Sequence, residues 1–246
     1  MIIHTYEKGE RGRACEEYIK SSTLGAYEVF ILPIPTTRDG ILIKDSDTPL
    51  EYITERAKAG VYVICYGLPR AVKEKMTLRG ARVYDAGEDE EFLSGNAELT
   101  ALATLGILLN TENRSPRELS FGIVGYGRIG KRLARLLLFL GARVRVYTSR
   151  DNTRLELCEY GVASSMSARD ADISDIDILI NTAPAVIFDT DSDELSRLRV
   201  IDLASGNNFP SLKTVESYPS IPAKMFPRTA GTLLGECAVC YFGNKK

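Results

Sequence analysis

The sequence predicts an α/β protein of two units, and three observations carry this prediction. Short apolar segments rich in β-branched residues alternate with helical segments from Met1 to Gly95. A second alternation of the same kind runs from Pro116 to Phe226. Between them lies a helical segment, Glu91–Leu109, that ends at a polar linker, Asn110–Pro116. Because strands that alternate with helices pair in parallel, each unit is expected to hold a parallel sheet.

The first unit contains four segments expected to be strands, with helices between them. Residues 1–95 are therefore assigned to a small flavodoxin-like α/β domain. A last helix, within residues 228–246, is expected to pack back on this domain. The predicted strands are Ile2–Tyr6, Val29–Ile34, Val61–Cys65 and Ala81–Tyr84, and the predicted helices are Glu16–Ser21, Leu50–Ala59, Pro69–Leu78 and Thr229–Tyr241.

The second unit opens on a glycine-rich turn between an apolar strand, Phe121–Val124, and an apolar-periodic helix, Ile129–Leu140. Gly125 permits a tight turn, Gly127 lets the backbone approach a pyrophosphate, and Gly130 lets the helix pack closely on the strand. Phosphates favour the helix N-terminus, where the N–H groups are unpaired. A glycine turn without a ligand is the alternative. The context predicts a Rossmann doubly wound parallel sheet over residues 96–227, with a dinucleotide bound by Gly125, Tyr126, Gly127, Arg128, Ile129 and Gly130.

The second strand of this unit is expected at Arg143–Thr148. The residues that follow it indicate which dinucleotide binds. NAD-specific sites place an Asp or Glu about twenty residues beyond the glycines, where it accepts a hydrogen bond from the ribose 2′-OH. Here Ser149 and Arg150 occupy that place, and a hydroxyl and a guanidinium suit a 2′-phosphate. We therefore expect NADP(H), with NAD(H) as the alternative if Arg150 is only a solvated loop charge.

Two further apolar segments, Asp177–Asn181 and Leu198–Leu203, are expected to be buried parallel strands, and Arg154–Tyr160 a helix. Ligands of doubly wound sheets bind at the carboxyl ends of the strands. Small and polar residues follow each predicted strand at this end. The cofactor site is therefore expected to include Thr148, Ser149, Arg150, Asn181, Thr182, Ala183, Pro184, Ala204 and Ser205.

Composition argues against several other classes of protein. The 246 residues include 31 Lys and Arg against 33 Asp and Glu, and a net charge of -2 does not favour a nucleic-acid partner. No run of about eighteen apolar residues and no signal peptide stands out, so we expect a cytoplasmic protein without a membrane span.

The five cysteines are expected to be reduced thiols, because they are odd in number and scattered through a large chain. Cys237 and Cys240 form a C-x-x-C near the C-terminus. The chain has one histidine and no second ligand pair, so two core residues on one helical face are expected there rather than a zinc site. No metal is expected.

Five short sequence motifs are distributed over nearly the whole chain. They are Ile31-Leu32-Pro33 with Thr36-Thr37, the glycine turn, Asp175–Pro184, Asp202-Leu203-Ala204-Ser205, and Pro227-Arg228-Thr229-Ala230-Gly231. This set resembles the dipicolinate synthase A-chain family, which is related to the two-domain NAD(P)-dependent 2-hydroxyacid dehydrogenases. The resemblance implies a substrate domain and an NAD(P) domain, oxidation of dihydrodipicolinate to dipicolinate, and a partner in the form of a flavoprotein-like second subunit.

The chain departs from this family in several places. It is shorter at its N-terminus, where the family opens with a further glycine-bearing strand, turn and helix. Gly206–Phe209 replaces Arg-Pro-Gly-Gly, Ala223 replaces a glycine, and Leu102 stands where the linking helix commonly has an acid. A second class of function therefore stays open, namely a catalytically silent dinucleotide-binding subunit or sensor in a larger assembly.

No catalytic residue is assigned from the sequence. Lactate-type chemistry needs a general acid or base near neutral pH, and the one histidine, His4, lies in a predicted edge strand where a structural role is expected. Aromatising oxidation of a dihydropyridine depends less on a protein base, because the driving force lies in the substrate. The missing histidine therefore fits the reaction that the resemblance implies.

A small dicarboxylate substrate would need cations and hydroxyls to bind it. The candidates, expected to face an interdomain cleft, are Thr36, Thr37, Arg38, Arg228 and Thr229. Capping of the last helix by Thr229, and a turn at Asp39-Gly40 flanked by Arg38, are the alternatives. A homo-oligomer is also expected.

Overall fold

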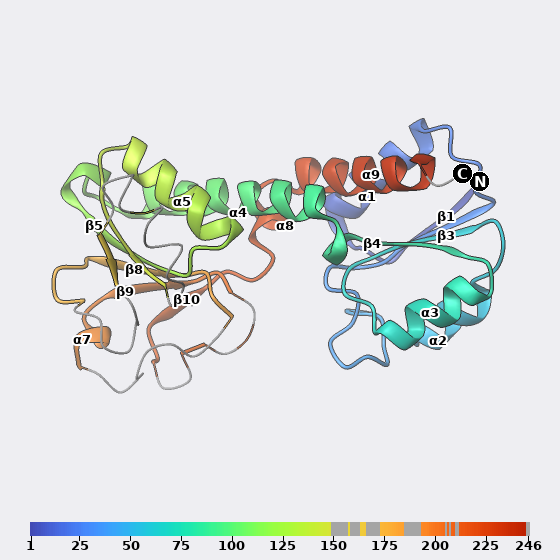
Figure 1. The fold of residues 1–246 in the computed structure, drawn as a ribbon, viewed down its shortest axis with the longest axis horizontal. Helices are drawn as coiled ribbons and strands as arrows, with labels where there is room; N and C mark the ends of the chain where they lie inside the picture. Colours follow the sequence, from blue (N-terminus) through green and yellow to red (C-terminus); the bar gives the residue numbers. More distant parts are fainter. Residues whose placement is uncertain are drawn as a thin grey trace. The chain divides into compact units, whose positions relative to one another are not determined.

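The computed structural model describes residues 1–148, 157, 163–165, 173–184, 193–204, 206, 208–209 and 212–244. The chain divides into two compact units (Figure 1). Unit 1 comprises Met1–Leu99 and Pro222–Lys246, and unit 2 comprises Thr100–Ile221. The division falls inside the helix α4 (Glu90–Thr111), which also holds the boundary predicted at residues 95 and 96.

Unit 1 is built on a four-stranded parallel sheet in the order β1-β2-β3-β4. The four predicted strands are confirmed: Val61–Cys65 matches at both ends, and the ends of the other three differ by no more than three residues. The order lacks the outer strand beside the first that gives flavodoxin its order 2-1-3-4-5, so β1 lies at an edge of the sheet. The strands are β1 (Ile2–Thr5), β2 (Glu28–Ile31), β3 (Val61–Cys65) and β4 (Arg82–Asp85).

Helices cover both faces of this sheet, and each face has its own core. On one face, Cys15 and Ile19 of α1 (Gly9–Ser21) pack with Leu234 of α9 (Pro227–Asn244). On the other, Ile53 of α2 (Leu50–Arg56) packs with Met76 of α3 (Arg70–Leu78). A short 3-10 helix, η1 (Ala86–Glu88), follows β4.

The connection through α1 has the opposite hand to the connections through α2 and α3. All four strands are parallel and follow one another across the sheet in one direction. The hand of a connection is then set by the face that its helix covers, and α1 lies on the other face from α2 and α3. Since right-handed connections are the strong preference, the α1 connection is the exception.

The helix α1 begins at Gly9, well before the predicted start at Glu16. Charged residues in its first turns conceal the apolar period, yet Arg11 is buried and its Nη2 lies 2.8 Å from Oε2 of Glu7. Glycines of α9 allow close packing here: a Cβ at Gly231 would lie 2.2 Å from the Arg11 carbonyl oxygen. Small residues therefore bring α9 against α1.

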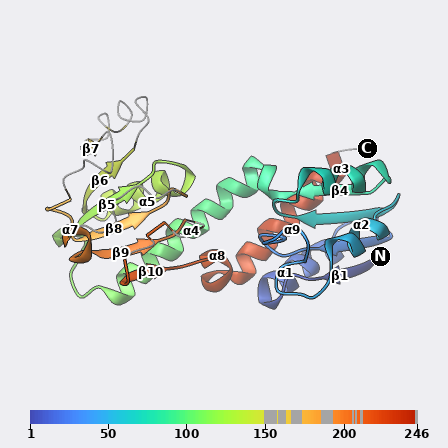
Figure 2. The same ribbon diagram turned by 90° about the horizontal axis from the view of Figure 1, so that it is seen from below.

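Unit 2 holds a six-stranded parallel sheet in the order β10-β9-β8-β5-β6-β7 (Figure 2). Counted along the chain within the unit, this is the order 3-2-1-4-5-6 of the Rossmann fold, so the predicted fold class is confirmed. The strands are β5 (Ser120–Val124), β6 (Arg143–Tyr147), β7 (Ala163–Ser165), β8 (Ile178–Asn181), β9 (Arg199–Asp202) and β10 (Val215–Ser217).

Several short elements of this unit were not predicted, because three to five residues are too few to show a period. Of the predicted helix Arg154–Tyr160, only Leu157 is among the described residues, and it is helical and buried in the core of unit 2. The long helix α5 (Arg128–Phe139) agrees with the predicted one to within a residue at each end. The unpredicted elements are β7, β10, α7 (Asp193–Ser196) and the 3-10 helix η2 (Pro116–Glu118). The short helix α8 (Ile221–Met225), which was also not predicted, begins at the last residue of unit 2 and continues in unit 1.

The helix α4 is long and apolar enough, by length and composition, to cross a membrane. Its apolar side chains have other partners: Phe92 is buried in the core of unit 1, and Ala101 and Leu108 are buried in the core of unit 2. Core packing therefore accounts for part of the hydropathy of α4, while Leu102 and Leu109 are exposed.

The cysteines only partly follow the prediction. Cys15, Cys65 and Cys237 are buried free thiols, whereas Cys240 is exposed, so the expectation of two core residues in the C-x-x-C is wrong for Cys240. Cys240 lies three residues after Cys237 on α9, and its side chain falls outside the buried face of the helix. Cys158 lies outside the described residues. Among those that are described, no group of three or more His, Cys, Asp or Glu could hold a metal ion.

Candidate functional site

The glycine turn joins β5 to α5 and contains two glycines that the fold itself requires. Gly125 has φ +87°, and a Cβ on it would lie 2.9 Å from Oγ1 of Thr182. A Cβ at Gly130 would lie 2.2 Å from the carbonyl oxygen of Gly125. The tight turn and the close approach of helix to strand are therefore both present as predicted.

Gly127 differs from the other two glycines of the turn. It is the N-cap of α5 and has φ -84°, a value open to any residue. No heavy atom lies within 4 Å of the place that its Cβ would occupy. Nothing in the described part of the protein therefore requires glycine here.

The start of α5 carries no negative charge of its own. No side chain caps the helix, and its first turn has no acidic residue. Arg128 is exposed at the first position, while Tyr126 is buried with the ammonium of Lys131 5.1 Å from its ring centroid. Unpaired N–H groups and the helix dipole make this end suited to an anion.

The loop after β8 is tied to the glycine turn. Oγ1 of Thr182 donates to the carbonyl oxygen of Val124 at 2.8 Å, and the Thr182 N–H donates to the same oxygen at 2.9 Å. The Asn181 side chain clamps Ala183 from both sides, because its Nδ2 donates to the Ala183 carbonyl at 3.0 Å and its Oδ1 accepts from the Ala183 N–H at 3.1 Å. Pro184 follows directly. Of the predicted Asn181–Pro184 segment, the structure thus places Thr182 and Ala183 beside the turn, with Asn181 holding Ala183.

Two residues of this region were not predicted as part of the site. Asp202, the last residue of β9, and Asn208 are both buried, and Nδ2 of Asn208 donates to Oδ2 of Asp202 at 3.1 Å. The Ala204 N–H donates to Oδ1 of Asp202 at 3.1 Å, which places Ala204 in the same network. A strand that ends on an Asp followed by small and amide residues was the available signal, but it does not show which side chains meet.

The remaining predicted cofactor residues divide into two groups. Thr148 follows β6 directly and is buried. Ser149, Arg150 and Ser205 lie outside the described residues.

The glycine turn at the carboxyl end of β5 lies where the strand order reverses, because β5 has β6 on one side and β8 on the other.

The predicted substrate residues of the first chain segment are held by local bonds in unit 1. Thr36 is fully buried; its hydroxyl accepts from the Tyr66 N–H at 2.8 Å and donates to the Pro33 carbonyl at 3.2 Å. Thr37 accepts from the Gly40 N–H at 2.9 Å. Arg38 is exposed and its Nη2 lies 3.3 Å from Oδ1 of Asp45.

Arg228 and Thr229 lie in the first turn of α9, also in unit 1. The helix begins at Pro227, so Thr229 is inside it and is not its N-cap. Arg228 is 75% exposed, and its Nη2 lies 3.7 Å from Oε2 of Glu17. Within the described residues, no hydrogen bond or ion pair joins these two to Thr36, Thr37 or Arg38.

His4 has the surroundings of a structural residue. Its ring stacks on Phe30 at 4.8 Å, and its Nε2 lies 2.8 Å from Oε1 of Glu28. Burial opposes ionisation of Glu28, but hydrogen bonds from Arg56 and His4 outweigh it and lower the pKa of this carboxyl below its usual value.

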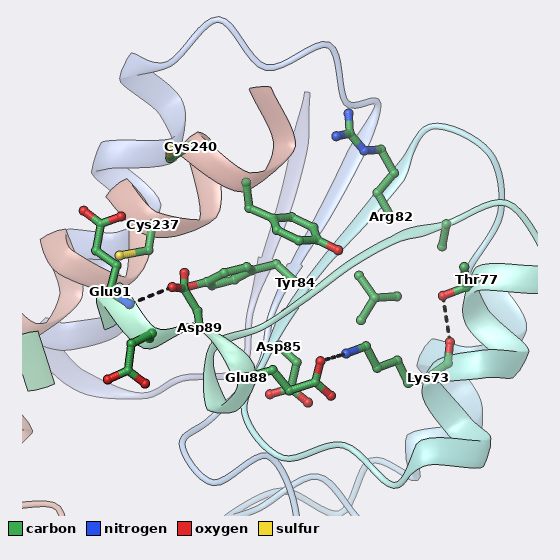
Figure 3. A pocket seen from close by; sticks show the side chains of 14 residues that line it. Lys73, Thr77, Arg82, Tyr84, Asp85, Glu88, Asp89, Glu91, Cys237 and Cys240 are labelled. Carbon is green, nitrogen blue, oxygen red and sulfur yellow. Dashed lines mark hydrogen bonds and ion pairs between the residues drawn. The ribbon is translucent and has the colours of Figure 1, made fainter. Parts of the chain in front are cut away.

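A pocket of about 750 Å³ in unit 1 lies along β4 between α3 and α9 (Figure 3). Its charged groups are largely used internally: Nζ of Lys73 lies 2.5 Å from Oε2 of Glu88, and the Tyr84 hydroxyl donates to Asp89 at 2.7 Å. Burial, with Asp89 nearby, raises the pKa of the Cys237 thiol to about 12, so it is not a nucleophile at neutral pH. None of the predicted site residues lines this pocket.

Comparison with known proteins agrees with this geometry. Residues 108–191 match the family model described as D-isomer specific 2-hydroxyacid dehydrogenase, NAD binding domain. A search of curated proteins finds no significant match.

Solved structures resemble the chain over nearly its full length. The A chain of dipicolinate synthase from Bacillus subtilis is 18% identical, with a TM-score of 0.76 over 98% of this chain and 94% of that one. The corresponding dipicolinate synthase chain from Bacillus halodurans is 21% identical, with a TM-score of 0.71 over 92% and 83%. A transhydrogenase from Sinorhizobium meliloti is 14% identical, with a TM-score of 0.62 over 98% and 92%.

At these identities the likeness shows the fold. Together, the strand order of unit 2, its glycine turn and the family match define an NAD-binding dehydrogenase-type fold.

Gly130 in α5 and Gly127 at its N-cap should respond differently to the same added methyl group. Gly130→Ala places a Cβ 2.2 Å from a backbone oxygen, and overpacking of this kind costs about 1–3 kcal/mol. Gly127→Ala meets open space, and the loss of a good N-cap residue costs less than about 1 kcal/mol. Urea unfolding followed by circular dichroism measures both. Equal stability of the two variants would contradict the close approach.

Proposed function

We propose that unit 2 binds a nicotinamide dinucleotide along Gly125–Gly130 and that the chain is an NADP-dependent oxidoreductase. The reaction we propose is that of the dipicolinate synthase A-chain family, oxidation of dihydrodipicolinate to dipicolinate, or the same chemistry on a related small dicarboxylate. The proposal rests on one observation: Gly127 lies at the N-terminus of α5, and a Cβ added to it would meet no heavy atom within 4 Å.

No contact within the described part of the protein explains why residue 127 is glycine. This supports a bound ligand as the explanation. Ser, Thr, Asn or Asp at an N-cap would offer the helix a side-chain hydrogen bond that glycine lacks. A side chain here would extend into the open space before α5. In a dinucleotide site that space belongs to the pyrophosphate, which needs the backbone N–H groups uncovered.

Replacing Gly127 should abolish cofactor binding without unfolding the protein. Gly127→Val puts a branched side chain where the pyrophosphate would approach, so we expect the affinity for NADPH to fall at least a hundredfold in calorimetry. Gly25→Val in unit 1 is the matched control, because Gly25 is exposed and a Cβ there also meets nothing within 4 Å. Wild-type NADPH affinity in Gly127→Val would remove the site assignment.

The preference for NADP(H) rests on Ser149 and Arg150, where an acid would select NAD(H). Arg150→Ala should weaken NADPH binding by about 1.5–3 kcal/mol if the guanidinium pairs with the 2′-phosphate. That is roughly a ten- to hundredfold rise in Kd. NADH affinity should barely change. Equal losses for both cofactors, or a parent protein that prefers NADH, would favour NAD instead.

The proposed reaction asks little of the protein in acid–base chemistry. A bound oxidised nicotinamide would supply the hydride acceptor for the dihydropyridine ring, and a proton would leave to solvent as the ring becomes aromatic. A lactate-type oxidation would need a histidine base, and His4 is bound to Glu28 and stacked on Phe30. The surroundings of His4 therefore support the aromatising reaction over lactate-type chemistry.

We further propose that exposed cations of unit 1 bind the substrate carboxylates, with Arg228 and Arg38 as the principal groups. Arg228→Ala should raise the Kd for dipicolinate about tenfold when NADP is present, since a charge-assisted hydrogen bond is lost. Arg13→Ala, an exposed arginine on α1, is the control. Isothermal titration measures both variants. Unchanged affinity in Arg228→Ala would remove it from the substrate site.

A silent dinucleotide-binding subunit or sensor is the second candidate, and a specific observation favours it. The Thr36 hydroxyl is fully used inside unit 1, while Arg38 and Arg228 already lie near Asp45 and Glu17. An assay of dihydrodipicolinate oxidation, with and without a flavoprotein-like second subunit, separates the two. NADPH binding without turnover in either arm would identify the silent form. The homo-oligomer is likewise a proposal, which sedimentation measures.

A further inference from the structure

Asp202 is a buried carboxylate without a cation beside it in the described part of the chain. Its exposed fraction is 3%, and it lies at the carboxyl end of β9. An ionised carboxylate is costly to bury unless hydrogen bonds replace its water. Here the donors are the Asn181 Nδ2 at 2.8 Å, the Ala204 N–H at 3.1 Å and the Asn208 Nδ2 at 3.1 Å. Three N–H donors therefore converge on one acid.

The acid fixes which way the Asn181 amide faces. A carboxylate only accepts hydrogen bonds, so the Asn181 NH2 must point toward Asp202 and its oxygen away. In that orientation the oxygen accepts from the Ala183 N–H at 3.1 Å, and Nδ2 also reaches the Ala183 carbonyl at 3.0 Å. A reversed amide would set the NH2 group against the Ala183 N–H. Asp202 thus determines how the Asn181 side chain holds Ala183.

The clamped segment in turn lies against the glycine turn. A Cβ added at Gly125 would lie 2.9 Å from Oγ1 of Thr182 and 3.2 Å from Cβ of Ala183. The Thr182 hydroxyl also bonds the Val124 carbonyl just before the turn. A continuous path therefore runs from Asp202 through Asn181 to the Thr182–Ala183 segment, and from the Thr182 hydroxyl to the carbonyl oxygens of Val124 and Gly125.

The position in the sheet indicates which half of a ligand this network serves. The strand order reverses between β5 and β8, and a dinucleotide in such a fold spans the reversal. The adenosine ribose is recognised by residues after the second strand, which is β6 here. The loops after β8 and β9 lie on the opposite side of the turn, so they belong to the nicotinamide half.

We propose that Asp202 is a positioning residue for the nicotinamide half of the dinucleotide site, acting through Asn181 on the Thr182–Pro184 segment. This inference rests on the proposed cofactor function. It predicts that loss of the acceptor at residue 202 weakens binding of the whole dinucleotide and leaves binding of its adenosine half intact. A residue that only stabilises unit 2 would not distinguish the two ligands.

The test uses the full chain with NADPH and with 2′,5′-ADP, which carries the adenosine half alone. Asp202→Leu keeps the branched shape of the side chain and removes the acceptor, and it should raise the Kd for NADPH at least tenfold while the Kd for 2′,5′-ADP stays within about twofold. Asp202→Asn keeps an oxygen that can face Asn181, and the Asn208 amide can turn to match its NH2. This conservative variant should therefore restore NADPH affinity to within about threefold of the parent.

Two further variants separate positioning from folding. Asn181→Ala removes the clamp itself and should discriminate between the ligands as Asp202→Leu does, which keeps the test decisive if Asp202→Leu does not fold. Asp177→Leu is the matched control at the amino end of β8, where Asp177 accepts from the Ser120 N–H at 2.8 Å. It should destabilise unit 2 without discriminating between the two ligands.

The possible outcomes test the positioning role of Asp202 separately from the proposed binding of a dinucleotide. A parent chain that binds neither ligand overturns the cofactor proposal and the inference with it. A parent that binds both, with an Asp202→Leu variant that binds NADPH normally or loses both ligands equally, overturns the inference alone. Failure of Asp202→Asn to restore NADPH affinity would likewise overturn the role of the acceptor oxygen.

Discussion

The close approach of Gly130 to the carbonyl oxygen of Gly125 is the constraint on which unit 2 depends. Only a residue without a Cβ can bring α5 this near to the end of β5, because the added atom would lie 2.2 Å from the oxygen. The approach directs the helix N-terminus at the space beyond β5. The buried face of α5, including Leu133 and Leu137, then packs into the core of unit 2. The anion-suited end of the helix and the core of the unit thus follow from one backbone contact.

Unit 1 uses the same device with a different outcome. A Cβ at Gly12 would lie 1.8 Å from the carbonyl oxygen of Glu7, at the same spacing in sequence as Gly130 and Gly125. The turn before α1 carries an acid, however, and the Glu7 carboxylate accepts from Arg11 and from the Ile34 N–H. An acid in this turn disfavours a phosphate, whereas the turn before α5 is free of acids. The two turns share a backbone solution, and their side chains separate a structural turn from a candidate binding turn.

Buried polar side chains at the carboxyl ends of the strands in unit 2 support the loop beside the glycine turn. Asp202, Asn181 and Asn208 are all nearly fully buried and bond one another, which rigidifies the loop next to the glycine turn. Elsewhere in the unit, Arg199 holds both Glu216 of β10 and Glu112 near the end of α4, and its guanidinium lowers the pKa of the Glu216 carboxyl. The short edge strand β10 is thereby tied to the rest of the sheet.

The amino-acid sequence by itself determined the elements with a clear period or a fixed glycine requirement. The strand Phe121–Val124, the turn and the helix after it needed no tertiary information, because apolar spacing and three glycines are local features. The strands around Val61 and Ile178 were equally evident as short buried apolar runs. The residues of the turn were therefore identified from local sequence alone.

Tertiary structure alone decided what depends on distant partners. The early start of α1 depends on Arg11 finding Glu7, and the edge position of β1 depends on which strands pair. The Asp202 network joins side chains that are 6 and 21 residues apart in sequence. The Tyr66 backbone N–H likewise donates to the hydroxyl of Thr36, 30 residues away. Hydrogen bonds between distant side chains have no period, so the sequence shows the groups but not the pairs that they form.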